Sequence, residues 1–430
     1  MHSIRLLLSR RFGPMFTTMA LGAFNDNFFK NALIILVTYS LAKQIGMNPA
    51  TLISIASAFF IIPFFLCSGL AGELADRMPK NRLVRILKVT ELVLMVFAAA
   101  ALITKVTWAL LLILFLIGMQ AAFFSPAKYA VLPELVAKEE LLVANGLIEA
   151  GTFFCILFGT LLGGLLILDP VGTELVSALL VVIAAIGVYA AWRVPETATA
   201  QPDMKINYNI LQSTWRMVLH AFADRNLMLP ILGISWFWAI GSTFLGQIPV
   251  FAKDILGADE KVVTLFNGIF TIGIALGSFA CAWISKRLAA HNLSAMALFG
   301  VFAFGLDVCW LGYHAPKPNP EELIGLITYL TASAHHLRLA LDLFLMAFSG
   351  GVFIVPLYTK LQMESAEHER ARTIASNNVV NALFVAVTSL SASVLFANHF
   401  TVLQVLLMFS LLNVPIIWLM ARPARRHTTP

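Results

Sequence analysis

One apolar stretch near the amino terminus carries polar and charged side chains at its centre. The segment GAFNDNFFKN places Asp26 four residues before Lys30, and Asn27 four residues before Asn31. Residues four apart share one helix face, and an acid that precedes a base by four is in the favourable order. At 1.5 Å of rise per residue, Asp26 lies about 18 Å into this apolar run, near a bilayer centre. Asp26, Asn27 and Lys30 are expected to form either a binding site for a polar headgroup or an ion, or an ion pair that only fixes helix packing.

Other charged side chains interrupt apolar runs further along the chain. Glu91 and Asp307 are interpreted as structural residues or as the edges of hydrophobic segments. Lys128 is placed at the end of an apolar run, where a long side chain ordinarily extends to the membrane surface. A buried charge costs about 2.5 to 3.5 kcal/mol even on lenient insertion scales, so each such group needs a partner or a polar cavity.

The chain lacks the motifs of several chemistries. Neither GxxxxGK[ST] nor GxGxxG occurs, so direct coupling to a nucleotide is unsupported. The nine histidines fall in tails, loops or the ends of apolar runs, and none has metal-ligand spacing with a carboxylate. No pair of nucleophile and base is evident. We therefore expect no enzyme activity, no metal and no cofactor.

Composition places these side chains in an integral membrane protein. Hydrophobic residues form 59% of the 430 residues and charged residues only 12%. Since a spanning helix takes about 20 apolar residues, roughly 12 spans account for the apolar fraction, and the net charge of +6 does not indicate nucleic acid. The predicted spans lie near 14–38, 51–72, 83–104, 107–124, 142–168, 173–192, 228–252, 260–284, 293–313, 338–359, 372–396 and 400–421.

The distribution of lysine and arginine predicts the topology. The amino-terminal arm, the turns after the even-numbered spans and the tail hold 22 of the 29 basic residues, with Lys88 counted in a turn, whereas the opposite loops hold six. Because basic loops stay in the cytoplasm, both termini are expected there. A polar interval containing PETATAQPDMKINYN divides the chain into residues 1–193, a cytoplasmic linker 194–226 and residues 227–430. The segment 314–338 is too short to span and is expected to lie in the outer interface.

The two large parts of the chain are similar to each other. The segment SPAKYAVLPELVAKEELLVANGLIEA follows the fourth span, and VPLYTKLQMESAEHERARTIASNNVVNAL follows the tenth. Each has a proline, a polar turn and a helix with two polar residues four apart, first Asn145 and Glu149, then Asn377 and Asn381. A duplicated six-helix unit is favoured over chance similarity of two polar loops, and such repeats surround a site near the bilayer midplane. These four residues are expected to line it.

The turn between the second and third spans has the sequence GELADRMPKNRLVR. Its glycine permits close helix approach, and its aspartate can pair with a cation or a helix N-terminus. The turn resembles that of the major facilitator superfamily, although WISKRL in the second half lacks the aspartate. The resemblance implies an all-α membrane protein with 12 transmembrane helices in two six-helix halves. It also implies a gate formed by Gly72, Asp76, Arg77, Lys80 and Arg82.

Four further segments are similar to the bacterial lysophospholipid transporter family. They are GAFNDNFFK, FFSPAKYAVLPEL, VANGLIEAGT and VPLYTKLQ, and they most resemble versions fused to acyltransferase and acyl-carrier-protein ligase domains. Free-standing family members tend to have an arginine midway along span 7. The corresponding stretch here is GSTFLGQIP, so Lys30 or Lys128 is expected to contact the phosphate instead.

The resemblance implies a lysophospholipid substrate, chiefly lysophosphatidylethanolamine, moved across the bacterial inner membrane to the cytoplasmic leaflet for reacylation. The expected mechanism is alternating access with a lateral opening to membrane lipids. The chain is expected to act as a monomer, with the acyltransferase and acyl-carrier-protein ligase as separate partners. The alternative is a proton-coupled exporter of drugs, siderophores or other small amphiphiles, although Thr160 stands where drug antiporters typically have proline in span 5.

Overall fold

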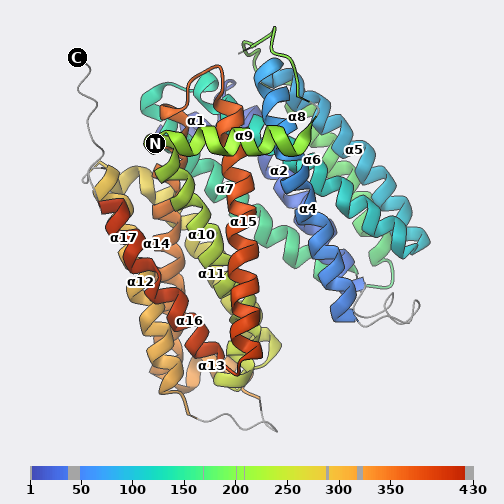
Figure 1. Ribbon diagram of the computed structural model, residues 1–430. Helices are drawn as coiled ribbons and strands as arrows, with labels where there is room; N and C mark the ends of the chain where they lie inside the picture. The colour runs from blue at the N-terminus through green and yellow to red at the C-terminus, as the bar shows by residue number, and fades with distance from the viewer. Residues whose placement is uncertain are drawn as a thin grey trace. The chain divides into compact units, whose positions relative to one another are not determined.

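A computed structural model describes residues 2–36, 49–167, 169–199, 201–207, 209–286, 290–316 and 323–421 (Figure 1). Within these ranges the chain is helical and forms two compact units. Unit 1 comprises residues 1–227 and 361–382, and unit 2 comprises residues 228–360 and 383–430. The sequence division at 193 and 226 stays a prediction, but the segment 361–382 packs within unit 1.

Unit 1 contains eight of the assigned α-helices and the neighbouring ends of α14 and α15. Apolar residues fill its interior, and Phe28, Phe29 and Leu33 are fully buried members of one core cluster. Helix α2 packs on α7 and α8, α4 packs on α6, and α5 packs on both α6 and α8. The helices are α1 (His2–Leu7), α2 (Gly13–Leu36), α4 (Pro49–Arg77), α5 (Lys80–Thr104), α6 (Thr107–Leu135), α7 (Leu141–Ile167), α8 (Gly172–Trp192) and α9 (Ile210–Ala223).

Two glycines bring α7 against α2. A Cβ atom on Gly159 would lie 2.5 Å from the Phe24 carbonyl oxygen, and one on Gly163 would lie 2.4 Å from the Phe28 carbonyl oxygen. Small residues four apart let membrane helices approach closely, where van der Waals packing can replace the missing hydrophobic driving force. The contact holds the polar face of α2 in a fixed position.

Gly163→Ala is expected to destabilise unit 1 by about 1 to 3 kcal/mol, because the added methyl group must displace backbone atoms of α2. Thermal unfolding of the purified protein in detergent measures the effect. Gly246→Ala is the matched control, since a Cβ there meets nothing within 4 Å. Equal unfolding temperatures for the two variants would contradict the close contact.

Unit 2 contains the remaining helices. Glycines again permit close approach, since a Cβ on Gly277 would lie 2.0 Å from the Phe348 carbonyl oxygen. Helix α12 packs on α16 and α17. The helices are α10 (Arg225–Val250, which begins in unit 1), α11 (Glu260–Ile284), α12 (Ala290–Tyr313), α13 (Leu326–Ala332), α14 (Ala334–Glu364), α15 (Arg370–Ala397), α16 (Val402–Leu411) and α17 (Asn413–Ala421).

The predicted spans correspond to helices along the described chain. Among the described residues, eleven helical segments are long and apolar enough to cross a membrane. Helix α2 falls outside that set because its asparagines, Asp26 and Lys30 lower its hydropathy, so the total of 12 stays a prediction. The last predicted span is two consecutive helices, α16 and α17, because Pro415 has no N–H to continue the helical ladder. Residue 38, the predicted end of the first span, lies outside the described residues.

Two lysines were assigned to the wrong positions relative to the spans. Lys88, counted as a turn residue, lies inside α5 with a fully buried side chain. Helix α6 continues to Leu135, so Lys128 lies within it and not at its end. The short helix expected in the segment 314–338 is α13, while residues 317–322 lie outside the described ranges.

The linker contains a helix that the sequence reading missed. Asn209 caps α9 by accepting a hydrogen bond from the Gln212 N–H at 3.2 Å. Ser213, Met217 and Ala221, each four residues apart, form its buried face. Helix α9 packs on α4 and lies crosswise to it in Figure 1.

Candidate functional site

The polar stretch of α2 places an unpaired carboxylate oxygen inside unit 1. Asp26 Oδ1 is buried and has no hydrogen-bond partner. Among the described residues no ion pair joins Asp26 to Lys30, whose ammonium instead lies 5.3 Å from the centre of the Phe60 ring. Asn27 donates to the Ala23 carbonyl at 2.8 Å, and Asn31 donates to the Thr160 carbonyl at 2.6 Å. The two asparagine side chains thus donate hydrogen bonds to backbone carbonyl groups, whereas the Asp26 Oδ1 atom can still accept one.

Lys88 and Glu91 form a closed pair beside this stretch. Their charged atoms are 2.5 Å apart, and their side chains are 0% and 4% exposed. Gln120 donates to the same carboxylate at 3.4 Å, and the Lys88 ammonium lies 5.2 Å from the Phe124 ring centre. A buried pair with this geometry neutralises both charges, and removal of one partner leaves the other uncompensated.

Glu149 and Lys128 add a second acid and base. The Tyr129 hydroxyl donates to Glu149 Oε1 at 2.6 Å, and Lys128 donates to the Thr152 hydroxyl at 3.3 Å. Lys128 also lies 4.9 Å from the Tyr129 ring centre.

Coulombic interactions connect these groups. Asp26 interacts with Lys30, Lys88, Glu91 and Lys128, and Lys128 also interacts with Glu149. The charged cluster therefore comprises three carboxylates and three ammonium groups inside the helices of unit 1. Its formal charges balance, which is compatible with a zwitterionic ligand.

The predicted asparagines have different surroundings. Asn145 is fully buried and forms two hydrogen bonds, of 2.6 and 3.2 Å, with Gln362. Gln362 also donates to the Tyr129 carbonyl at 3.0 Å. Asn377 is buried with neither amide atom hydrogen-bonded, and Asn381 is half-buried. The structure therefore places Asn145 in an amide pair with a residue that the sequence reading missed, although a glutamine in the apolar segment VPLYTKLQ was a usable signal.

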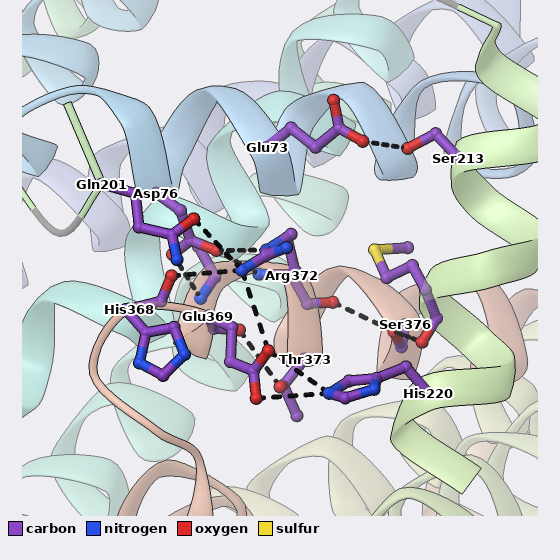
Figure 2. Close-up of polar contacts among 12 residues, drawn as sticks. Glu73, Asp76, Gln201, Ser213, His220, His368, Glu369, Arg372, Thr373 and Ser376 are labelled. Carbon is purple, nitrogen blue, oxygen red and sulfur yellow. Dashed lines mark hydrogen bonds and ion pairs between the residues drawn. The ribbon is translucent and has the colours of Figure 1, made fainter. Parts of the chain in front are cut away.

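Asp76 caps the start of α15, as Figure 2 shows. Its carboxylate accepts from the backbone N–H groups of Ala371 at 3.0 Å and Arg372 at 3.2 Å, and from the Arg372 side chain at 3.1 Å. Asp76 is 0% exposed. The predicted partner was a cation or a helix N-terminus, and Asp76 meets both at once. We call Asp76, Ala371 and Arg372 the latch.

The remaining turn residues have distinct positions around the latch. A Cβ on Gly72 would lie 2.9 Å from the Arg372 Cα atom, so glycine is needed for α4 to approach α15. Lys80 is buried and pairs with Glu134 at 2.7 Å. Arg77 and Arg82 are exposed.

Helix α9 and the linker border the latch from a third direction. Arg372 donates to the Gln201 side chain at 3.4 Å, and the Gln201 N–H donates to the Asp76 carbonyl at 2.9 Å. His220 of α9 lies 3.3 Å from Glu369. Residues of α4, α9 and the start of α15 together line a pocket of about 270 Å³. The linker therefore contacts both sides of the latch (Figure 2).

The described residues lack the arrangement that a metal site requires. Within the described ranges, no group of three or more histidine, cysteine, aspartate or glutamate residues has an arrangement that could hold a metal ion. The buried charges form ion pairs and hydrogen bonds suited to binding and conformational change.

Comparisons with known proteins give the family. The family model of the Major Facilitator Superfamily matches residues 19–389. Lysophospholipid transporters of Serratia proteamaculans and Yersinia enterocolitica are 29% and 28% identical to the chain. The first alignment covers 69% of this chain and 71% of the relative, and the second covers 83% and 80%. The resemblance to the bacterial lysophospholipid transporter family is thereby confirmed, and the likeness to its fused versions stays a prediction.

Solved structures confirm the fold. The human organic anion transporter MFSD10 has a TM-score of 0.74 at 15% identity, with 96% of this chain and 99% of that chain covered. An outward-facing bacterial homologue of the iron transporter ferroportin has a TM-score of 0.69 at 15% identity, with 95% and 99% covered. At such identity the likeness concerns architecture alone.

Proposed function

Because the chain belongs to the major facilitator superfamily, we propose that it is a membrane transporter of lysophospholipids. The bacterial relatives that cover most of its length are lysophospholipid transporters. Its helices are long and apolar enough to make it a multi-pass membrane protein. The bacterial relatives support a location in the inner membrane, and the basic loops support cytoplasmic termini.

The charged cluster of unit 1 is the observation that carries this proposal. A lysophosphatidylethanolamine headgroup has one ammonium and one phosphate, and the cluster offers both signs of charge within spanning helices. Asp26 is the proposed ammonium contact, because its Oδ1 atom needs a donor. Lys30 and Lys128 are the proposed phosphate contacts, because the Lys88 ammonium is already paired at 2.5 Å. Glu149 accepts a hydrogen bond from the Tyr129 hydroxyl and is the second carboxylate proposed to line the site.

The proposed mechanism is alternating access with a lateral opening. A lysolipid keeps its single acyl chain in an apolar environment while its headgroup enters the polar interior. The latch holds the start of α15 against α4, and its release would change access on the cytoplasmic side. The substrate moves to the cytoplasmic leaflet, where a separate acyltransferase and acyl-carrier-protein ligase consume it. The transporter acts as a monomer with two six-helix halves, residues 1–193 and 227–430, joined by the linker 194–226.

A vesicle assay tests the proposed function. Purified protein is reconstituted into liposomes that carry headgroup-labelled lysophosphatidylethanolamine, and a membrane-impermeant quencher reports the labelled fraction on each side. We expect labelled lipid to change sides faster than in protein-free vesicles, while diacyl phosphatidylethanolamine with the same label does not. Equal rates with and without protein would refute lysolipid transport.

The same vesicles test the proton-coupled exporter. In this version of the assay the vesicles contain a small amphiphilic dye in place of the lysolipid, and a proton gradient is imposed across their membrane. Dye movement that requires the gradient, together with no lysolipid movement, would favour the exporter. The span 5 sequence argues against it, because Thr160 stands where drug antiporters typically have proline.

A further inference from the structure

Unit 2 contains two carboxylates that share one guanidinium. Arg338 of α14 forms a bidentate contact with Asp307 of α12, at 2.8 Å through Nη2 and 3.1 Å through Nε. Asp342, one turn further along α14, lies 4.0 Å from Arg338 Nε. With all three groups ionised, the cluster has one negative charge in excess.

The buried carboxylate lacks a donor in that state. The Asp342 side chain is 7% exposed, and its Oδ2 atom has no hydrogen-bond partner. The carboxylates of Asp307 and Asp342 both lie within 4.0 Å of the Arg338 guanidinium, and two ionised carboxylates cannot donate a hydrogen bond to each other. Carboxylates this close favour a form in which one proton is shared. A single proton would supply the missing donor and cancel the excess charge.

The charged residues of the neighbouring helices α11, α16 and α17 do not supply the missing donor. Helices α16 and α17, which pack on α12, contain no charged residue. In α11 the only charged residues are Glu260 and Lys261 of the first turn. Within the described residues, neither of them forms an ion pair or hydrogen bond with the two carboxylates.

Aromatic and histidine side chains also lie near the cluster, and the His335 Nε2 atom is buried without a hydrogen-bond partner. The Arg338 guanidinium lies 5.4 Å from the Trp310 ring centre, and the His314 ring lies 4.5 Å from the same ring. His336 stacks on Tyr329 of α13 at 4.3 Å, and the His335 ring lies 6.3 Å from that of His336. These rings contact one another or Arg338. Within the described residues, none of them donates a hydrogen bond to Asp342 Oδ2.

The cluster has a route for proton exchange. An open hollow of about 380 Å³ is lined by Asp307 and Trp310 together with Ala303, Phe304 and Leu306. The Asp307 side chain is 27% exposed and that of Arg338 is 53% exposed. Asp307 is therefore the more accessible of the two carboxylates, since the Asp342 side chain is only 7% exposed.

We propose that Asp307 and Asp342 form a site that binds one proton, so that H⁺ is a ligand of this transporter in addition to its lipid. On binding, the proton forms an O–H bond on one carboxylate and a hydrogen bond to the other, while Arg338 keeps its charge. On release, the proton returns to water through the hollow. This site lies outside the charged cluster of unit 1 and does not depend on which lipid is carried.

Infrared difference spectroscopy tests the proposal on the full chain in lipid nanodiscs without lysolipid. As the pH is lowered, the wild type is expected to gain a protonated-carboxyl signal that exceeds that of the cluster variants by one group per chain. These variants, Asp342→Asn and Asp307→Asn, should each lack that excess, because the remaining carboxylate then has Arg338 to itself. The matched control is Asp254→Asn, an exposed residue of the same unit, which should keep the signal.

The outcomes separate the alternatives. A signal of wild-type size in both cluster variants, or a wild type that gains none, would overturn the proposal. Size-exclusion profiles establish that each variant is folded, and Asp307, being partly exposed, provides the variant with the smaller risk of misfolding. Because no lysolipid is present, failure here leaves the vesicle assay of lipid transport unaffected.

Discussion

Asp76→Asn is expected to release the start of α15 from α4. The variant keeps the shape of the side chain but has one acceptor oxygen where the carboxylate has two, so at least one buried N–H of α15 loses its partner. Each unpaired buried donor costs about 1 to 3 kcal/mol, and 1.4 kcal/mol is a tenfold change in an equilibrium constant. Hydrogen exchange at the Ala371 and Arg372 amides should therefore accelerate by about tenfold or more.

The control for this variant is Asp203→Asn, an exposed aspartate in the linker. It makes the same chemical change and should leave exchange at α15 unaltered. Transport by Asp76→Asn should be slower with an unchanged preference among lysolipid headgroups, because the latch does not belong to the charged cluster. Unchanged exchange in both variants would mean that Asp76 does not hold α15, and altered headgroup preference would place it in the binding site.

Asp26→Asn is expected to reduce lysolipid transport strongly with little loss of stability. Hydrogen bonds that involve a charged partner contribute about 1.5 to 3 kcal/mol, so affinity for an ammonium headgroup should fall by about 10- to 100-fold. The fold should tolerate the change, because Asp26 Oδ1 has no protein partner to lose. Vesicle transport and thermal unfolding measure the two effects separately.

Glu91→Gln provides the contrasting variant. It removes the partner of a fully buried Lys88, and breaking such a pair costs about 3 to 5 kcal/mol. We expect a lowered unfolding temperature for Glu91→Gln and a near-normal one for Asp26→Asn. If Asp26→Asn unfolds as readily as Glu91→Gln, Asp26 is structural and the headgroup role assigned to it is wrong.

The sequence was sufficient for the positions of most helices but not for all their ends. Apolar runs predict spans because the bilayer requires them, and the helices coincide with those runs. Lys88 was counted with the basic turn because it is a lysine near the start of the predicted span 83–104, whereas its pairing with Glu91 allows it to be buried inside α5. Helix α9 was missed because it lies in a polar linker, although the Asn209 cap and an apolar face of period four were readable signals.

The sequence was sufficient to predict the type of interaction at the candidate sites, but not the residues that form it. The requirement that Asp76 meet a cation or a helix N-terminus follows from its charge. The identity of its donors, Ala371 and Arg372, does not follow from the sequence, because these residues are 295 and 296 positions away. Gln362 likewise meets Asn145 across 217 residues. Such pairings depend on the tertiary arrangement of helices, about which local patterns carry no information.

The long separation between Asp76 and its donors also affects how the protein is made. Ribosomes add about 5 to 20 residues per second, so the 295 residues that separate Asp76 from Ala371 take about 15 to 60 s to synthesise. During that interval α4 is present with an acceptor that has no donor, and the start of α15 does not yet exist. The latch can form only after most of the chain has entered the membrane. Until then the Asp76 carboxylate lacks its donors, so an incompletely synthesised chain differs from the finished one at this site.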